Sequence, residues 1–385
     1  MTFDPSRFLP DDLLERIRER APIHDRENTF PEQDLAELRA AGYLSILVPA
    51  ERGGAGLSLE QAAILQQRLA TASPATALAI NMHLVWTGVA KVFSDRGVPG
   101  LEFVQDGAVA GDVFAFGISE AGNDLVLFGS DTEATPQGDG AYAFTGMKIF
   151  TSLAPVWTKL GLHGLDTTSP DGPKLVFAFI DRTDAVTTSD DWDTLGMRAT
   201  QSRTTRIDGA VAAAEHVVRR IDPGPGADPI IFGIFSVFEL LLASVYTGVA
   251  RRALDLSVQT VQKRTSKKTG LAYSQDPDIR WRIADMSLAY EALPPQIAAL
   301  ARDVDEQADH GALWFTLLSG TKHRAVTMAK HVVDQAVLTA GGGAYFSSNE
   351  LSRLYRDVLA GMFHPSDPES AHSAAASALL GPLQG

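Results

Sequence analysis

The chain has 385 residues, no cysteine and 45% hydrophobic residues, so it is long enough and apolar enough for two or three packed domains. Without cysteine it can form no disulfide, iron–sulfur cluster or thiolate zinc site, so any redox chemistry must come from a bound organic cofactor. The formal net charge of -14 repels phosphate backbones, which argues against nucleic acid as a partner.

The N-terminal part of the chain has the hydrophobic spacing that predicts helices. The first twenty residues are charged throughout and contain no apolar stretch typical of a secretory signal, so we expect the protein in the cytoplasm. From residue 11 to about residue 94, apolar residues recur at three- and four-residue spacing, interrupted by the glycine-rich segment PAERGGAGLS. This pattern predicts an N-terminal helical domain over residues 1–112.

The middle of the chain changes to the pattern of a sheet. Short runs of alternating polarity, such as AYAFTGMKIF and KLVFAFI, occur between residues 114 and 218. Turn-forming residues separate them at 137–140 and 169–172. We therefore predict a central β-domain over residues 113–221.

The C-terminal part returns to helical periodicity. The segment DPGPGADP, residues 222–229, reads as a linker, and a helical domain is predicted over residues 222–385. The run from Pro229 to Ala250 is apolar enough to cross a membrane, but Glu239 stands at its centre. Because a charge at the middle of a bilayer costs about 2.5–3.5 kcal/mol, we expect a buried core helix and no membrane insertion.

Five segments in order along the chain resemble the acyl-CoA dehydrogenase family. They are GYLSILVPAERGGAGLS (42–58), FGISEAGNDL (116–125), FTGMKIFTSLA (144–154), LGMRATQSRTT (195–205) and TAGGGAYFSSNELSRLYRD (339–357). The resemblance implies an α+β multidomain fold, with an N-terminal helical domain, a central β-barrel-like domain and a C-terminal four-helix bundle. It also implies a bound flavin, FAD by preference with FMN possible, because the family's usual glutamine before the glycine loop is Leu338 here.

Two strand segments of the resemblance supply the expected flavin-ring contacts. A flavin ring needs a hydrogen-bonding edge and an apolar or aromatic face. The candidate contacts are Phe116, Ile118, Ser119, Phe150 and Ser152. The alternative is that these are ordinary strand residues around a buried aromatic side chain.

The resemblance also implies a pyrophosphate site shared between subunits. Gly341, Gly342 and Gly343 allow backbone amides to approach a phosphate closely, although the same run fits a helix C-cap and turn. Arg264 matches a family arginine that reaches the cofactor of a neighbouring subunit; its alternative is a solvated helix end. A homo-oligomer, either a dimer or a tetramer, is therefore expected.

The usual catalytic base of the family is missing. In most members a glutamate follows the Arg-Asp pair near the C-terminus, where this sequence has His364 and Pro365. In a minority the glutamate lies on the first C-terminal helix, where this chain has Phe238, followed by Glu239. An apolar helix would raise the pKa of Glu239 towards that of a useful base. Alternatively, Glu239 is a buried acid paired with an arginine such as Arg251 or Arg206.

The same fold also hosts flavin-dependent hydroxylases that lack this glutamate. His364 resembles the histidine of those relatives near the end of the last helix, and His83 is a second candidate facing the substrate. We expect FAD-dependent α,β-dehydrogenation of an acyl-CoA, with Glu239 as base and an electron-acceptor flavoprotein as partner. The alternatives are a two-component monooxygenase that uses His364 and His83 and is served by a flavin reductase, and a catalytically inactive acyl-CoA- or flavin-binding homologue.

Overall fold

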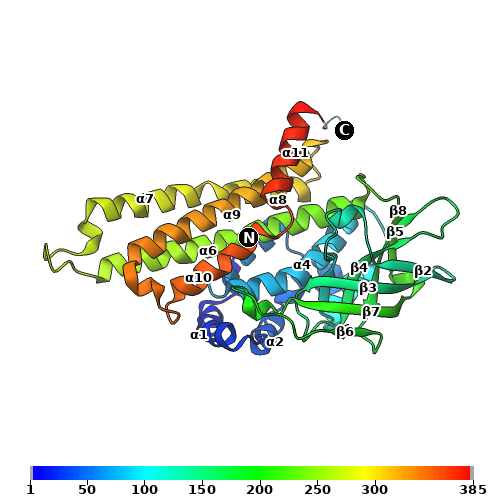
Figure 1. The fold of residues 1–385 in the computed structure, drawn as a ribbon, viewed down its shortest axis with the longest axis horizontal. Helices are drawn as coiled ribbons and strands as arrows, with labels where there is room; N and C mark the ends of the chain where they lie inside the picture. Colours follow the sequence, from blue (N-terminus) through cyan, green and yellow to red (C-terminus); the bar gives the residue numbers. More distant parts are fainter. Residues whose placement is uncertain (1–2, 382–385) are drawn as a thin grey trace.

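A computed structural model describes residues 3–381, and it shows helices, then a sheet, then helices in chain order (Figure 1). The N-terminal helices are α1 (Asp11–Glu27), α2 (Glu32–Ala40), α3 (Leu59–Ala70), α4 (Pro74–Asp95) and α5 (Glu102–Ala110). Local chemistry sets their starts: Ser58 and Gln61 form a reciprocal capping box on α3, and Ser73 caps α4. The glycine-rich segment between α2 and α3 separates them, as predicted.

The middle of the chain forms a mixed sheet. Its strands are β1 (Phe114–Gly117), β2 (Glu133–Gly138), β3 (Ala141–Thr151), β4 (Lys159–Asp166), β5 (Lys174–Asp181), β6 (Val186–Thr188), β7 (Arg203–Ala212) and β8 (Val217–Ile221). The hydrogen-bonded order is β6-β7-β3-β2-β4-β5-β8, and β1 pairs in parallel with β4. The antiparallel β3–β7 pair is central to the site, because it brings the end of β3 beside the residues that precede β7.

The C-terminal part is a set of packed helices. They are α6 (Pro229–Lys263), α7 (Pro277–Glu291), α8 (Leu293–Asp305), α9 (Leu313–Ala340), α10 (Glu350–Leu359) and α11 (Pro368–Leu380). Asp228 caps α6 and Pro229 occupies its first turn, so the proline-rich linker also starts the helix. The most apolar window of α6 is 89% buried among the described residues, which confirms a core helix.

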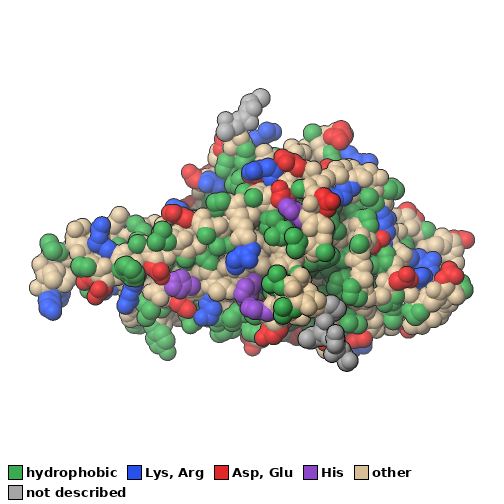
Figure 2. Space-filling model, turned by 90° about the horizontal axis from the view of Figure 1, so that it is seen from above, with side chains coloured by type: hydrophobic (Ala, Val, Ile, Leu, Met, Phe, Trp, Pro, Cys, Tyr) green, Lys and Arg blue, Asp and Glu red, His purple; other side chains and the backbone are tan. Residues whose placement is uncertain are grey.

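The three parts meet around α4 and α6. Figure 1 shows these two helices side by side, with α4 between α6 and the sheet. Breaks between the parts fall at 110–114 and 221–229, beside the predicted domain boundaries. Figure 2 shows acidic and basic side chains interspersed on the face that it presents, without a basic stripe.

Candidate functional site

A cavity of about 630 Å³ opens where the sheet, α4, α6 and the turn after α10 meet. Its walls include Met82 of α4, the end of β1 and the loop after it, the end of β3, residues 192–202, Phe238 of α6 and residues 359–366. Each wall comes from a different part of the chain. Tertiary packing therefore creates this cavity, and no single motif contains it.

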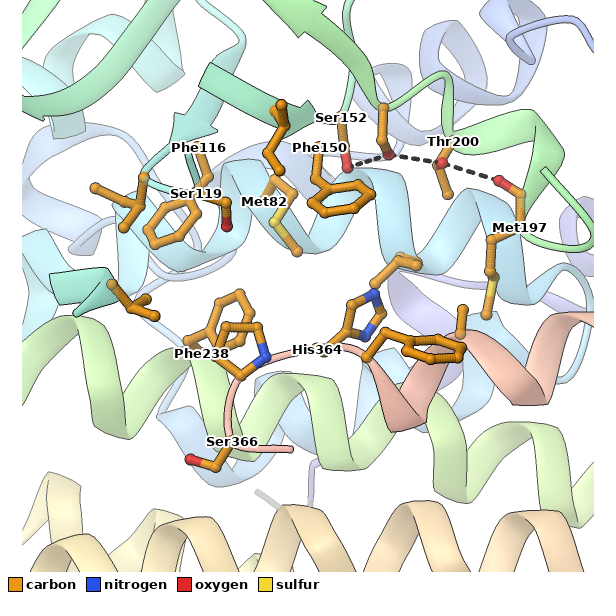
Figure 3. A pocket seen from close by; sticks show the side chains of 18 of the residues that line it. Met82, Phe116, Ser119, Phe150, Ser152, Met197, Thr200, Phe238, His364 and Ser366 are labelled. Carbon is orange, nitrogen blue, oxygen red and sulfur yellow. Dashed lines mark hydrogen bonds between the residues drawn. The ribbon is translucent and has the colours of Figure 1, made fainter. Parts of the chain in front are cut away.

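Aromatic side chains form much of the wall (Figure 3). Phe116 and Phe238 stack with their ring centres 5.5 Å apart and their planes 24° apart. Phe150 has 57% of its surface exposed and a backbone φ of 57°, an unfavourable conformation for a phenylalanine. An exposed aromatic ring on strained backbone inside a concavity fits a flat apolar group that would lie against it.

Hydroxyl groups lie beside these rings in an ordered row. Ser152 Oγ and Ser202 Oγ are 2.7 Å apart, and Ser202 Oγ lies 2.7 Å from Thr200 Oγ1. Thr200 Oγ1 in turn donates to the backbone oxygen of Met197 over 2.8 Å (Figure 3). The whole row lies on the cavity wall, and Ser119 lines the same cavity. Aromatic faces next to a polar edge match the requirements of an isoalloxazine ring.

A buried ion pair holds the loop that carries Ser119. Lys148 Nζ of β3 donates to Glu120 over 2.6 Å, and Glu120 also accepts from Ser130, Thr132 and the Asp131 amide. Burial alone would raise the pKa of Glu120, but the Lys148 ammonium and these hydrogen bonds hold it well below its usual range. The loop after β1 is therefore fixed on the wall of the cavity.

His364 faces the cavity from the turn after α10 (Figure 3). Its Nδ1 lies 3.2 Å from the hydroxyl of Tyr246, a fully buried residue of α6. Burial, together with the nearby Lys322 charge, lowers the pKa of His364 to about 3, so the ring is neutral near pH 7. Tyr246 has no other hydrogen-bond partner among residues 3–381, so the satisfied arrangement has its hydroxyl donating to Nδ1 and places the imidazole proton on Nε2.

Lys322 fixes the turn that carries His364. Its buried Nζ donates to the backbone oxygens of Gly361, His364 and Ser366 at 3.0, 2.7 and 2.7 Å. These three bonds use all three protons of the ammonium group. Burial lowers the pKa of Lys322 to about 8, whereas the field of Glu239 raises it. The lysine was not singled out from the sequence, because an isolated lysine in a helical pattern carries no signal of burial.

Glu239 lines the cavity, but one of its carboxylate oxygens is tied to the turn after α10. Its Oε1 accepts from the amide and hydroxyl of Ser366 at 3.0 and 2.8 Å, and Ser366 lies on the far side of the turn (Figure 3). Phe238, one residue earlier, also lines the cavity. Burial raises the pKa of Glu239 to about 7, against the lowering effect of Lys322. The expected arginine partners were wrong: Arg251 pairs with Asp255, and the carboxylate interacts with Ser366 and Lys322.

His83 belongs to the core and not to the cavity wall. Its ring is fully buried, with Nε2 2.8 Å from the Leu44 oxygen and Nδ1 accepting from the Phe114 amide at 3.2 Å. Both ring nitrogens are thus occupied, and burial lowers the pKa of His83 to about 4. This geometry is contrary to the expectation that His83 faces the substrate.

Arg264 and Gly343, the last glycine of the run, line a second cavity of about 560 Å³. Arg264 donates to the Ala340 oxygen over 2.6 Å, and its guanidinium stacks on Tyr273. Gly341 begins a 3-10 turn, Gly341–Tyr345, with a φ of 70° that glycine tolerates. Neither Arg264 nor the three glycines line the first cavity, and their roles at the cofactor pyrophosphate stay predictions.

The architecture and the aromatic, hydroxyl-edged cavity define a flavoprotein, and comparison with known proteins specifies its family. The model of the acyl-CoA dehydrogenase N-terminal domain matches residues 11–94, and the model of the C-terminal domain matches residues 240–366. The chain belongs to the acyl-CoA dehydrogenase family. It is a flavin-dependent oxidoreductase, and both FAD and FMN are compatible with its relatives.

Individual relatives cover nearly the whole chain. YdbM of Bacillus subtilis (strain 168), by its name a candidate acyl-CoA dehydrogenase, is 26% identical over 95% of this chain and 94% of its own. L-evernosamine nitrososynthase of a Micromonospora strain is 28% identical over 91% of this chain and 84% of its own. The structure of KijD3 with FMN and a dTDP-amino-sugar is similar with a TM-score of 0.87 and 26% identity, covering 100% of this chain and 96% of that chain.

Proposed function

We propose that this protein is a two-component flavin monooxygenase that takes reduced flavin from a separate reductase. The observation that carries the proposal concerns two side chains on the cavity wall: His364 lines it from the turn after α10, whereas Glu239 has its Oε1 bound to the amide and hydroxyl of Ser366. A dehydrogenase needs a base within hydrogen-bond reach of the substrate carbon. Glu239 lines the cavity, but Ser366 holds its Oε1, which does not favour that chemistry.

Bound reduced flavin would supply two electrons to dioxygen, so that one oxygen atom enters the substrate and the other leaves as water. Phe116, Phe150 and Phe238 would hold the flavin and the substrate between apolar surfaces and exclude water. His364 would present its Nε2–H to the reacting oxygen and orient it. Because the imidazole stays neutral near pH 7, it would act as a hydrogen-bond donor and not as a cation.

The cavity favours an uncharged, mainly aromatic substrate. Among residues 3–381, the arginine on its wall is Arg356, which is already paired with Asp25 and bonded to the Leu195 oxygen. A phosphate or carboxylate in the cavity would therefore meet no free cation, while Asp124 would repel it. This property distinguishes the chain from a binder of dTDP-sugars within the same cavity.

Acyl-CoA dehydrogenation is the second candidate. It is favoured by the raised pKa of Glu239, which suits a general base, and by its Oε2, which has no hydrogen-bond partner among residues 3–381. For this reaction Oε2 would have to reach the substrate carbon while Ser366 holds Oε1.

We also propose that the protein is a homo-oligomer whose copies complete each other's cofactor sites. Large apolar side chains are exposed on α7 and the turn after α9: Trp281, Leu288, Tyr345 and Phe346 are 69–92% exposed. An exposed apolar surface of this kind favours a protein partner. Light scattering after gel filtration tests the proposal, and a monomer at all concentrations would contradict it.

The monooxygenase and the dehydrogenase differ in their need for oxygen and in their substrate, so two experiments distinguish them. With a flavin reductase, NADH and ¹⁸O₂, an aromatic substrate should gain one labelled oxygen atom in the presence of this protein. His364→Ala should lower that rate by about 100-fold or more, within the range of general acid–base effects. His331→Ala, on α9 outside the cavity, should leave the rate unchanged. Anaerobic bleaching of bound flavin by an acyl-CoA thioester, abolished in Glu239→Gln, would instead establish the dehydrogenase.

A further inference from the structure

Tyr246 is a polar side chain buried in the apolar interior of α6. It is fully buried, and among residues 3–381 its hydroxyl has one partner, Nδ1 of His364 at 3.2 Å. Burial and the charge of Asp357 raise the pKa of this hydroxyl well above its usual value of 10, so it keeps its proton near neutral pH. Because a buried hydroxyl proton needs an acceptor, it points to Nδ1.

The turn that carries His364 is shaped around the phenol ring of Tyr246. A Cβ at position 361 would lie 2.9 Å from Cε1 and Cζ of that ring, so Gly361 leaves the room that the ring needs. Lys322 holds the backbone oxygens of Gly361 and His364 at 3.0 and 2.7 Å. The backbone of His364 is therefore fixed by Lys322, and its imidazole ring by Tyr246.

The hydroxyl of Tyr246 contributes little to the packing of the core. A phenylalanine at position 246 has the same ring and would fill the same space beside Gly361, with no polar group to bury. The contact that the hydroxyl adds is the one with Nδ1 of His364. Its role is therefore to be found at His364.

The contact at Nδ1 decides what the other ring nitrogen of His364 offers. A neutral imidazole carries one proton, so an Nδ1 that accepts leaves that proton on Nε2. His364 lines the cavity and Nε2 has no partner among residues 3–381, so its N–H is available to a ligand. In the opposite tautomer Nε2 would present a lone pair and could act as a base.

We infer that Tyr246 is a positioning residue that holds His364 as an Nε2–H donor and withholds from it the role of a general base. The inference rests on the proposed function, in which His364 orients the reacting oxygen. Tyr246 is not among the residues that line the cavity, so it acts through His364.

Nuclear magnetic resonance of protein labelled with ¹⁵N in its nine histidines tests the inference without flavin, oxygen or substrate. Long-range ¹H–¹⁵N correlations distinguish the two neutral tautomers, and the signals of His364 are those missing from His364→Ala. The wild type should carry its proton on Nε2. Tyr246→Phe should lower the ratio of the Nε2–H to the Nδ1–H form by about three- to tenfold, the range for one lost hydrogen bond.

Tyr43→Phe is the matched control. Tyr43 is also fully buried, and its hydroxyl donates to Oε1 of Gln66 over 2.7 Å, where neither residue lines the cavity. This variant also loses a buried hydrogen bond, but it should leave the signals of His364 unchanged. In the ¹⁸O₂ experiment Tyr246→Phe should lower kcat by about three- to tenfold, with the KM for the aromatic substrate and the Kd for FMN unchanged. Tyr43→Phe should change none of these values.

A wild-type His364 with its proton on Nδ1, or an unchanged tautomer ratio in Tyr246→Phe, would overturn the inference. An unchanged kcat in Tyr246→Phe at equal folded fraction would also overturn it, because Tyr246 would then serve only the core. The spectra require no catalysis. They decide the tautomer even if the wild type transfers no oxygen, a result that would contradict the proposed function alone.

Discussion

The buried carboxylate of Glu239 should make the stability of the protein depend on pH in a defined direction. Burial raises its pKa from 4.5 to about 7, so the folded protein holds a proton that the unfolded chain has already lost. The stabilisation from Glu239 is complete below pH 4.5 and is lost as the pH rises through 7. A shift of this size corresponds to about 3 kcal/mol in total.

Glu239→Gln isolates this effect, because a glutamine is neutral throughout the range. Between pH 5.5 and 7.5 the wild type should lose about 2 kcal/mol of unfolding free energy relative to Glu239→Gln. Urea unfolding at both pH values, followed by tryptophan fluorescence, measures the difference. Glu51→Gln at an exposed position serves as the control and should show no such change. A constant difference between wild type and Glu239→Gln at the two pH values would refute the reasoning and show that Glu239 stays charged in the fold, neutralised by Lys322.

Three further substitutions test individual contacts of the structure. Lys322→Met should lower the free energy of unfolding by about 3–5 kcal/mol, because it leaves three buried carbonyl oxygens and Glu239 without their cation. A decrease below about 1 kcal/mol in urea unfolding would show that Lys322 does not fix the turn that carries His364. Arg264→Ala should reduce the flavin-to-protein absorbance ratio after gel filtration while Arg280→Ala does not, and an unchanged ratio would remove Arg264 from the cofactor site. His83→Ala should lower the unfolding free energy by about 2–4 kcal/mol, because it leaves a cavity and an unpaired Phe114 amide. An unchanged flavin content at equal folded fraction would confirm that His83 belongs to the core. A loss of flavin at equal folded fraction would show that His83 belongs to the cofactor site.

Local signals in the sequence were sufficient for the order of the three parts. The change from helical spacing to alternating runs near residue 114 marks where α5 ends and β1 begins. The proline- and glycine-rich segment at 222–229 marks the return to helices, and its Asp228 is itself the cap of α6. These patterns are local because backbone geometry and turn chemistry depend on neighbouring residues.

The sequence pattern did not predict which way a side chain points from its helix or strand. Phe238 and Glu239 are adjacent and both line the cavity, but about 100° of helical rotation separates their directions, and Phe238 stacks on Phe116 while Glu239 bonds to Ser366. His83 looked like a site residue, but its two ring nitrogens are bonded to Leu44 and Phe114, which the fold brings together from different elements.

By itself, the sequence determined the family, the flavin and the segments that surround it, because those depend on residue types in a fixed order. Tertiary structure alone decided which groups face the cavity and with what polarity. The direction of the Ser152 hydroxyl depends on Ser202, Thr200 and the Met197 oxygen, which are some fifty residues away along the chain. A hydrogen bond requires donor and acceptor within about 3 Å, and only the folding of β3 against β7 brings these atoms that close.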